Sequence, residues 1–116
     1  MKAVIYHNTR CSKSRATLDI LRERQVEPEI VNYLDTPPSR AELQRILGLL
    51  GKPAQAILRF SEPLCQELGI APQDQRGNDE WIDILLAHPI LIERPIVVIG
   101  ERAVLGRPPE NVLSIL

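Results

Sequence analysis

The order of the apolar runs in the first third of the chain is the feature that most restricts its fold. A short apolar run, Ala3–Tyr6, is followed by a polar loop, by an amphipathic segment from Ser12 to Arg24 and by a run containing Ile and Val, Glu29–Tyr33. The spacing of the apolar residues predicts a strand, a helix and a second strand in that order. Such a unit of about thirty residues folds as a right-handed crossover between two parallel strands. We therefore expect a parallel pair with a helix packed on it.

The middle of the chain, from about residue 39 to residue 87, predicts a block of helices without a clear strand. Ser39 and Glu42 have the spacing of a capping box, and the apolar residues that follow recur at helical intervals until Gly51, which we expect to end the helix. Three shorter helices are expected after it, namely Pro53–Leu58, a helix capped by Ser61 and ended by Gly69, and a helix capped by Asn78 and ended at His88-Pro89.

The last part of the chain predicts a hairpin and a final helix. The short run Ile90–Ile92 is expected to be extended, and Ile96–Ile99 has the β-branched content of a buried strand. Gly100-Glu101 fits a tight loop, after which Arg102–Leu105 returns as the antiparallel partner. Prolines then open a helix with Val112, Leu113 and Leu116 as its expected apolar face.

Taken together, these elements predict the α/β class. Their order matches a thioredoxin/glutaredoxin-like core, a small mixed four-stranded sheet with flanking helices, into which an all-helical insertion of about residues 39–87 is placed before the hairpin. The length of 116 residues suits a single domain, residues 1–116.

Composition excludes several classes of function. The net charge is −1 and only 3% of the residues are aromatic, which argues against a protein that binds DNA or RNA. No apolar run approaches membrane-spanning length, and the N-terminus lacks the pattern of a signal peptide. Cys11 and Cys65, the two cysteines, have neither the spacing of a disulfide framework nor that of a metal site. We expect a cytoplasmic protein in which a lone reactive thiol survives.

The loop His7–Arg15 carries the residues with the clearest chemical potential. Cys11 stands where this loop becomes the first helix, so its sulfur faces unpaired backbone N–H groups and the positive end of the helix dipole. Arg10, Lys13 and Arg15 add positive charge, and such surroundings lower a cysteine pKa from its usual value of about 8.5. The same geometry binds oxyanions. A lone cysteine can instead be a small buried hydrophobe, but the polar neighbours of Cys11 favour a nucleophile.

Other polar residues near this loop have more than one interpretation. Ser12 and Ser14 are expected to cap the helix, and Asn8 either shapes the turn or bonds the nucleophile. Cys65 follows Leu64 on a short predicted helix, and we expect it to be buried and structural.

Several short motifs occur in a fixed order along the whole chain. They are Tyr6-His7-Asn8 with Cys11 and Ser14-Arg15, Tyr33-Leu34 with Thr36-Pro37-Pro38-Ser39-Arg40, Leu58-Arg59, Arg94-Pro95 and Gly106-Arg107-Pro108. In this order they resemble the glutaredoxin-coupled arsenate reductase family. The Cys-Ser-Lys-Ser-Arg version of the active loop is closest to a chromosomal branch of that family, whereas the plasmid-borne enzymes carry Gly-Thr after the cysteine.

The resemblance implies a role for each matched residue. Cys11 would be the catalytic nucleophile that attacks arsenate, and His7 would help to lower its pKa. The oxyanion would be held by three arginines, and four further residues would support the site. The three are Arg59, Arg94 and Arg107; the supporting residues are Asn8, Ser14, Arg15 and Pro95, the last in a cis peptide bond. Glutathione and a glutaredoxin would supply the electrons, with no bound cofactor and no metal.

Two other functions remain open at this level. Spx-type regulators have the same fold and bind RNA polymerase, but they typically carry a second cysteine where this chain has Ser14. A general glutathione-linked thiol oxidoreductase without oxyanion specificity is the other alternative.

Overall fold

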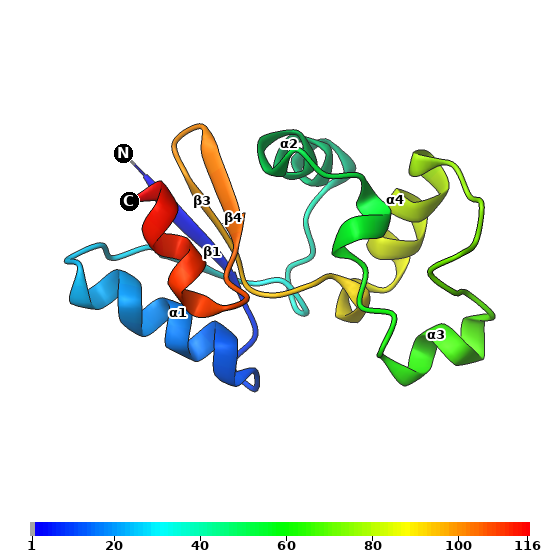
Figure 1. Cartoon of the computed structure of the whole chain (residues 1–116), viewed down its shortest axis with the longest axis horizontal. Helices are drawn as coiled ribbons and strands as arrows, with labels where there is room; N and C mark the ends of the chain where they lie inside the picture. Colours follow the sequence, from blue (N-terminus) through cyan, green and yellow to red (C-terminus); the bar gives the residue numbers. More distant parts are fainter. Residues whose placement is uncertain (1) are drawn as a thin grey trace.

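The computed structural model describes residues 2–116, which form a four-stranded sheet with helices on both faces and a helical block beside it (Figure 1). The strands are β1 (Ala3–His7), β2 (Glu29–Asn32), β3 (Ile96–Ile99) and β4 (Arg102–Leu105). The α-helices are α1 (Ser12–Glu23), α2 (Arg40–Leu50), α3 (Pro63–Leu68) and α4 (Asn78–Ala87), and the short 3-10 helices are η1 (Ala54–Ile57), η2 (Pro89–Leu91) and η3 (Pro109–Ile115).

The sheet is mixed, in the order β2-β1-β3-β4. β1 and β2 are parallel, with His7 opposite Asn32, and α1 makes the crossover between them. β3 runs antiparallel to both β1 and β4, and Gly100 opens the β3–β4 turn with a φ of +60°. Such a φ is strained for any residue with a Cβ, which explains the glycine at the start of the turn. The expected α/β class and the thioredoxin-like order of elements are confirmed.

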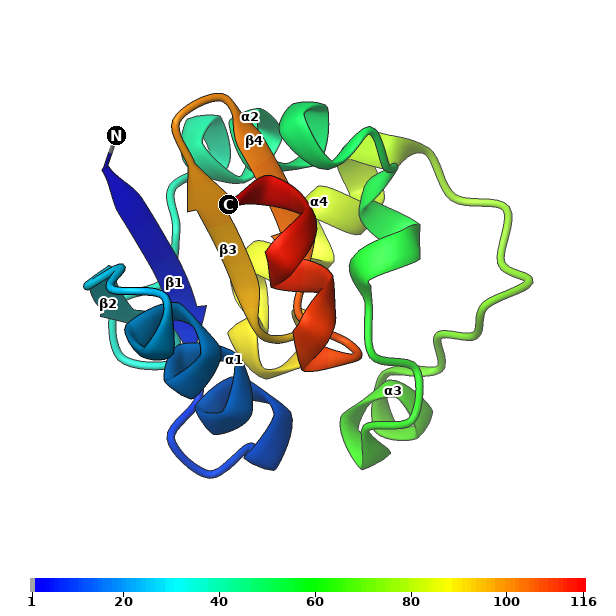
Figure 2. The ribbon, with the colours of Figure 1, turned by 60° about the vertical axis from the view of Figure 1, so that its left-hand side comes forward.

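Alternation along the strands divides the core between the two faces of the sheet. The helix α1 and the C-terminal η3 cover one face of the sheet (Figure 2). Ile5 and Val97 point to that face, where they form a small apolar cluster with Leu18, Leu21 and Val112. The intervening residues of the same strands point to the other face. They join a larger cluster with the helical block, which includes Tyr6, Ile96, Val98, Leu43, Ile46, Trp81 and Leu85.

The helical block occupies the expected part of the chain, and it returns to the sheet through a short extended contact. Leu58 forms an isolated antiparallel bridge with Ile92, flanked by two backbone hydrogen bonds of 2.7 Å, from Arg59 N to Leu91 O and from Glu93 N to Ile57 O. The expectation that Ile90–Ile92 is extended was wrong for most of that run. Pro89 instead begins η2, a 3-10 helix of one turn, and Leu91 in this helix is completely buried.

The cap predicted for α2 is confirmed. Glu42 N donates to Ser39 Oγ at 3.1 Å, and Gly51 ends the helix with a φ of +66°. The other half of the capping box is replaced by a tertiary contact, because the Glu42 carboxylate accepts a hydrogen bond of 2.7 Å from the Tyr6 hydroxyl.

The caps predicted at Ser61 and Asn78 were wrong. α3 begins after Glu62, because Pro63 is well suited to the first helical position. α4 begins after Gly77, and Asn78 is already helical. The Asn78 side chain accepts a hydrogen bond of 2.9 Å from Ala54 N, so it connects α4 to η1 rather than capping its own helix.

The last helix differs from the prediction in its period. η3 is a 3-10 helix, and residues three apart share a face in such a helix. Val112 and Ile115 therefore pack on the sheet, whereas Leu113 and Leu116 are 39% and 45% exposed. The expected apolar face was right for Val112 and wrong for the two leucines.

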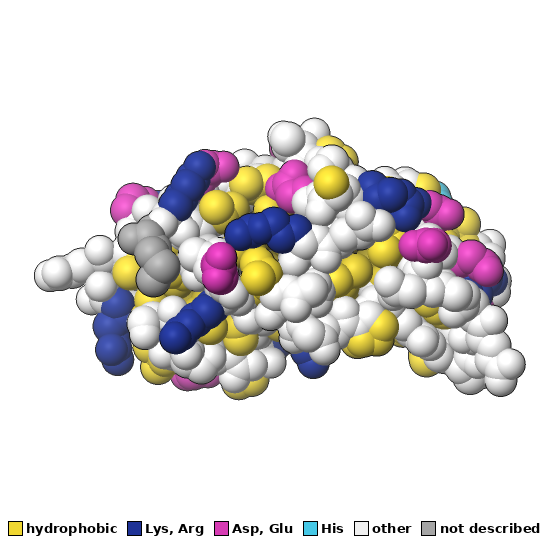
Figure 3. Space-filling model, turned by 90° about the horizontal axis from the view of Figure 1, so that it is seen from above, with side chains coloured by type: hydrophobic (Ala, Val, Ile, Leu, Met, Phe, Trp, Pro, Cys, Tyr) yellow, Lys and Arg dark blue, Asp and Glu magenta, His cyan; other side chains and the backbone are white. Residues whose placement is uncertain are grey.

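The surface is mixed in charge. Figure 3 shows Lys and Arg side chains interspersed with Asp and Glu over the face that it presents, in keeping with the net charge of −1. Within residues 2–116, no helix combines the length and the apolar character that crossing a membrane requires.

Candidate active site

Cys11 occupies the N-cap position of α1, at the carboxyl end of β1. Its backbone is extended, with φ −95° and ψ 120°, and its carbonyl accepts the hydrogen bond from Arg15 N at 3.0 Å that starts the helix. The side chain is half-buried and faces the first turn, where the N–H groups of Lys13 and Ser14 are free to act on the sulfur.

The loop before Cys11 is held by its own polar groups. Cys11 N donates to Asn8 O at 3.0 Å, and the Asn8 side chain accepts from Arg10 N at 2.9 Å. Arg15 reaches back from α1 and donates to Thr9 O at 2.8 Å. Asn8 therefore shapes the turn, which was one of its two predicted roles, and Arg15 braces the loop.

Ser14 is completely buried, and it connects the helix to the strand rather than capping the helix. Its Oγ lies 2.6 Å from His7 Nδ1 and accepts from Asn8 N at 3.1 Å. The structure gives α1 no side-chain cap, so the prediction that Ser12 or Ser14 caps it was wrong. The Ser14 side chain points inward because Ser14 lies in the first turn of α1 and faces the buried end of β1.

His7 is 5% exposed, and its polar contact is with Ser14. Burial lowers the pKa of His7, and the charges of Arg15 and Arg22 lower it further. The imidazole is therefore neutral at pH 7 and orders the loop through Ser14. The predicted effect of His7 on the thiol stays a prediction.

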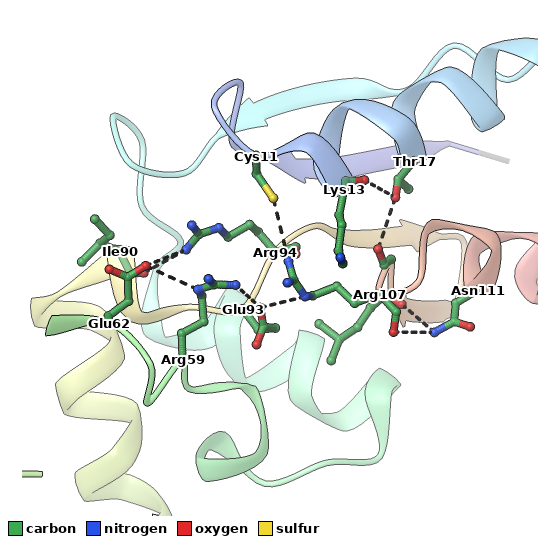
Figure 4. Close-up of polar contacts among 12 residues, drawn as sticks. Cys11, Lys13, Thr17, Arg59, Glu62, Ile90, Glu93, Arg94, Arg107 and Asn111 are labelled. Atoms are coloured by element: carbon green, nitrogen blue, oxygen red, sulfur yellow. Dashed lines mark hydrogen bonds and ion pairs between the residues drawn. The ribbon is translucent and has the colours of Figure 1, made fainter. Parts of the chain in front are cut away.

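The three arginines singled out in the sequence meet beside Cys11, although they come from three separate segments (Figure 4). Arg107 Nη1 lies 3.8 Å from Cys11 Sγ and also donates to Arg94 O at 3.1 Å. The pKa of the Cys11 thiol reflects this setting. Burial acts to raise it, but the Ser14 N–H, the Arg94 guanidinium and the Lys13 N–H outweigh burial and lower it.

Two glutamates connect the arginines into one chain of ion pairs. Glu62 lies 3.4 Å from Arg59 and 3.3 Å from Arg94, and Glu93 lies 2.7 Å from Arg59 and 3.3 Å from Arg107. Their side chains are between 13% and 29% exposed. We name these five residues the arginine–glutamate cluster. It holds three positive charges and two negative ones, so it keeps a positive balance next to the sulfur.

Local backbone contacts place each arginine. Arg59 follows the bridge between Leu58 and Ile92, and Arg94 precedes a cis peptide bond to Pro95, as expected. Arg107 follows Gly106, whose N–H donates to Pro95 O at 2.9 Å. A Cβ on Gly106 would lie 2.5 Å from Thr17 Oγ1 and 2.7 Å from Pro95 Cγ, so only glycine fits there.

Four buried side-chain atoms within residues 2–116 lack a hydrogen-bond partner, and two of them are the Nε atoms of Arg59 and Arg94. Arg59 Nε has only the 3.4 Å ion-pair contact with Glu62, which does not form a hydrogen bond. Buried donors are nearly always paired in folded proteins, so unpaired donors beside a nucleophile indicate a place for an acceptor. The structure thus offers an anion site whose donors are only partly used by the two glutamates.

Cys65 is 2% exposed, and its thiol donates to Arg59 O at 3.4 Å. Burial, followed by the nearby Glu62 charge, raises its pKa. The predicted burial of Cys65 is confirmed, and this sulfur is protonated and enclosed at neutral pH.

A groove of about 560 Å³ opens on the other side of the Cys11 loop. Its lining includes Asn8 and Arg10 from the loop, Asp35 from the turn after β2, and Ile90 and Arg94. Arg94 therefore belongs to both the groove and the arginine–glutamate cluster. Within residues 2–116 we find no group of three or more His, Cys, Asp and Glu side chains that could hold a metal ion.

Cys11 and the three arginines were singled out from the sequence, but the residues that arrange them were not. Glu62 and Glu93 left a weak signal, because each stands close in sequence to an arginine of the site. Gly106 and Thr17 left none, since their contact joins segments 89 residues apart.

Several known proteins are similar to this chain over nearly its whole length. The ArsC family model matches residues 6–115. An arsenate reductase from Neisseria meningitidis is 44% identical over 113 residues, covering 97% of this chain and 96% of the relative, and the uncharacterized protein YfgD of Escherichia coli is 47% identical, covering 97% and 94%. A solved structure described as arsenate reductase from Vibrio cholerae superposes with a TM-score of 0.93 at 45% identity and covers 100% of this chain and 98% of its own. With a family model that spans nearly its whole length and relatives this similar, the chain belongs to the ArsC family.

Proposed function

We propose that this protein reduces arsenate to arsenite, with Cys11 as the nucleophile and glutathione and a glutaredoxin as the source of electrons. The observation that carries the proposal is the position of Cys11 Sγ, 3.8 Å from Arg107 and beside Arg94, whose buried Nε has no hydrogen-bond partner. The names of the relatives from Neisseria meningitidis and Vibrio cholerae point to the same substrate.

Arsenate fits the arginine–glutamate cluster by charge and by shape. Like phosphate, it carries between about one and two negative charges near pH 7 and offers several acceptor oxygens. Guanidinium groups are planar donors that stay charged at every relevant pH, and they bind such anions in pairs of hydrogen bonds. The unpaired Nε atoms of Arg59 and Arg94 would gain acceptors, while Glu62 and Glu93 keep the arginines in place.

The chemistry requires a second thiol. The Cys11 thiolate attacks arsenic and displaces an oxygen as water, which forms a sulfur–arsenic bond. A second thiol then attacks the adduct, two electrons pass to arsenic, and the two sulfurs leave as a disulfide. Overall, dihydrogen arsenate, two thiols and a proton become arsenous acid, a disulfide and a water molecule. A low pKa of Cys11 favours the first step because the thiolate is the reactive form.

An external thiol is the better source of the second sulfur. Cys65 is enclosed, protonated and bonded to a carbonyl, so it is unsuited to this step. The groove beside the Cys11 loop provides access for a peptide thiol, because it combines cationic Arg10 and Arg94 with anionic Asp35. Glutathione, which carries two carboxylates and one ammonium group, has the charges to match.

A coupled assay tests the proposal. Arsenate-dependent oxidation of NADPH is followed with glutathione, a glutaredoxin and glutathione reductase, and we expect turnover that is lost in Cys11→Ser and retained in Cys65→Ser. Equal rates for the wild type and Cys11→Ser would contradict the proposal. Activity on a glutathionylated peptide without activity on arsenate would instead favour a general thiol oxidoreductase.

A further inference from the structure

Tyr33 has a buried hydroxyl that the proposed chemistry does not use. Its side chain is 1% exposed, and its Oη is one of the four buried side-chain atoms without a hydrogen-bond partner within residues 2–116. Tyrosine hydroxyls that are buried usually find a hydrogen-bond partner, since an unpaired one loses its hydration without compensation. We call a buried polar atom without a hydrogen-bond partner orphaned, and the orphaned Tyr33 hydroxyl needs a physical explanation.

The ring of Tyr33 is fixed by packing. It belongs to the larger apolar cluster, and together with Leu43, Ile46, Ile92 and Ile96 it lines a small apolar space. The ring therefore cannot turn its hydroxyl out to solvent, and the direction of the hydroxyl is a property of the fold.

Tyr33 lies beside the candidate active site. It directly follows β2, whose last residue pairs with His7, so Tyr33 lies beside Asn8 at the end of β1. Its ring shares the small apolar space with Ile92 and Ile96, which stand two residues before and two residues after Arg94. Burial raises the pKa of Tyr33, while the charge of Arg94, a side-chain hydrogen bond from Asn8 and the charge of Arg59 act to lower it. An amide donor such as Asn8 occupies the phenol oxygen only, so the O–H proton has no acceptor. The phenol stays protonated at neutral pH and can donate.

Three of the four orphaned atoms belong to residues of the candidate site or next to it. Tyr33 Oη, Arg59 Nε and Arg94 Nε belong to side chains that lie around Cys11, whereas the fourth, Trp81 Nε1, belongs to α4 in the helical block. A tetrahedral oxyanion next to the sulfur offers several acceptor oxygens, enough for all three donors at once.

We propose that the Tyr33 hydroxyl is a further binding group for the oxyanion, donating a hydrogen bond to an oxygen of the anion held by Arg59 and Arg94. This inference rests on the proposed function and assigns a specific contact within it. The donor is neutral and rigidly placed, so it orients the tetrahedral anion against Cys11 Sγ without adding charge to the cluster.

Protection of Cys11 from alkylation tests this contact without any turnover. Cys11 is treated with iodoacetamide at neutral pH over a series of arsenate concentrations, without added thiol, and the modified peptide is quantified. We expect arsenate to protect Cys11 in the wild type. Tyr33→Phe should need at least about tenfold more arsenate for the same protection, because a hydrogen bond to a charged group is among the stronger ones. The alkylation rate without anion should stay the same in both proteins.

Tyr6→Phe is the matched control. Tyr6 is also buried, but its hydroxyl already donates to Glu42 at 2.7 Å in the contact with α2. We expect Tyr6→Phe to lose stability in urea and to keep the arsenate protection of the wild type. Tyr33→Phe should show the opposite pair of effects, since the orphaned hydroxyl makes no bond in the free protein.

The outcomes separate this inference from the proposed function. Equal protection of the wild type and Tyr33→Phe would overturn the Tyr33 contact and leave the reductase proposal intact, whereas no protection of the wild type would overturn both. A change in the alkylation rate without anion, at unchanged arsenate affinity, would show that the hydroxyl acts on the thiolate and would overturn the contact. A marked loss of stability in Tyr33→Phe would also overturn it, because the hydroxyl would then have a partner in the free protein.

Discussion

Cys11 depends on groups from distant parts of the chain as well as on its own helix. The N–H groups of Lys13 and Ser14 come from the first turn of α1, whereas Arg94 comes from the segment before β3. The sequence shows the first contribution directly, since a polar loop leads into an amphipathic helix at Cys11. The contribution of Arg94 was predicted only from the order of motifs. Arg94 comes close to Cys11 only because β1 pairs with β3, and local sequence does not show that pairing.

The arginine that lowers the Cys11 pKa can be tested by titration. We expect Arg94→Ala to raise the pKa of Cys11, because an opposite charge close by favours the ionised form. The thiolate absorbance of the protein, followed against pH, reports this value. In the wild type the thiolate persists below the ordinary cysteine pKa and is lost as the pH falls through the lowered value.

Arg102→Ala is the control for this titration, since Arg102 is exposed at the start of β4. Its removal should leave the pKa of Cys11 unchanged. A similar shift in both variants, or none in Arg94→Ala, would mean that the arginine at the site has no special influence on the sulfur.

The residues that the sequence could not reveal act through tertiary contacts. Tyr33 reads as the end of a strand, and nothing in its neighbourhood along the chain shows that its hydroxyl lacks a partner. Glu62 and Glu93 were not singled out from the sequence, and they lie between the arginines in the folded protein. Binary patterning predicts which side chains are buried, and it carries no information about which polar atoms meet.

At the scale of elements, apolar periodicity predicted the helices and strands better than local signals predicted their first residues. Ser39 caps α2 as expected, whereas α3 starts after Glu62 and not at Ser61. Ser39 has Glu42 three residues later and so forms a capping box, whereas Ser61 has Leu64 at the matching position. Pro63 decides the second case by fixing the first turn.

This difference between the serines is measurable. Ser39→Ala removes the acceptor for Glu42 N, and we expect it to lower the free energy of unfolding by about 1 kcal/mol. Ser61→Ala removes no cap and should change that free energy by less than about 0.5 kcal/mol. Urea unfolding of the two variants gives both values, and equal losses would contradict the assignment of the caps.

The junction between β4 and η3 depends on a close approach at Gly106. We expect Gly106→Ala to lower the free energy of unfolding by about 1–3 kcal/mol, since its Cβ would overlap Thr17 and Pro95. The same change should move Arg107, the next residue, and weaken arsenate turnover.

Gly48→Ala provides the matched control. Gly48 lies inside α2 with nothing within 4 Å of a Cβ, so alanine should raise the free energy of unfolding by about 0.5–1 kcal/mol and leave turnover unchanged. If Gly106→Ala were as stable and as active as Gly48→Ala, the close approach would not constrain the site.

At the scale of the whole molecule, the helical block and the sheet share one apolar cluster. Tyr6, Ile96 and Val98 from the sheet pack with Trp81 and its neighbours from the block. The bridge between Leu58 and Ile92 adds backbone hydrogen bonds between the helical block and the segment that leads into β3. It also fixes the position of Arg59, the residue after Leu58. The site is therefore complete only when the block is folded on the sheet.

This shared cluster predicts one cooperative unfolding transition. Trp81 is the single tryptophan and lies in the block, so its fluorescence reports that part, whereas far-ultraviolet circular dichroism reports the whole chain. The two signals should give the same midpoint in urea. Loss of the Trp81 signal at a clearly lower urea concentration would show that the block unfolds separately.

The most direct test of the account is a crystal structure of the protein with arsenate and no thiol reductant. We predict a tetrahedral arsenic centre bonded to Cys11 Sγ or in contact with it, with oxygens that accept hydrogen bonds from Arg59, Arg94 and Arg107. Arsenate bound elsewhere, with the arginines still paired only to Glu62 and Glu93, would contradict it.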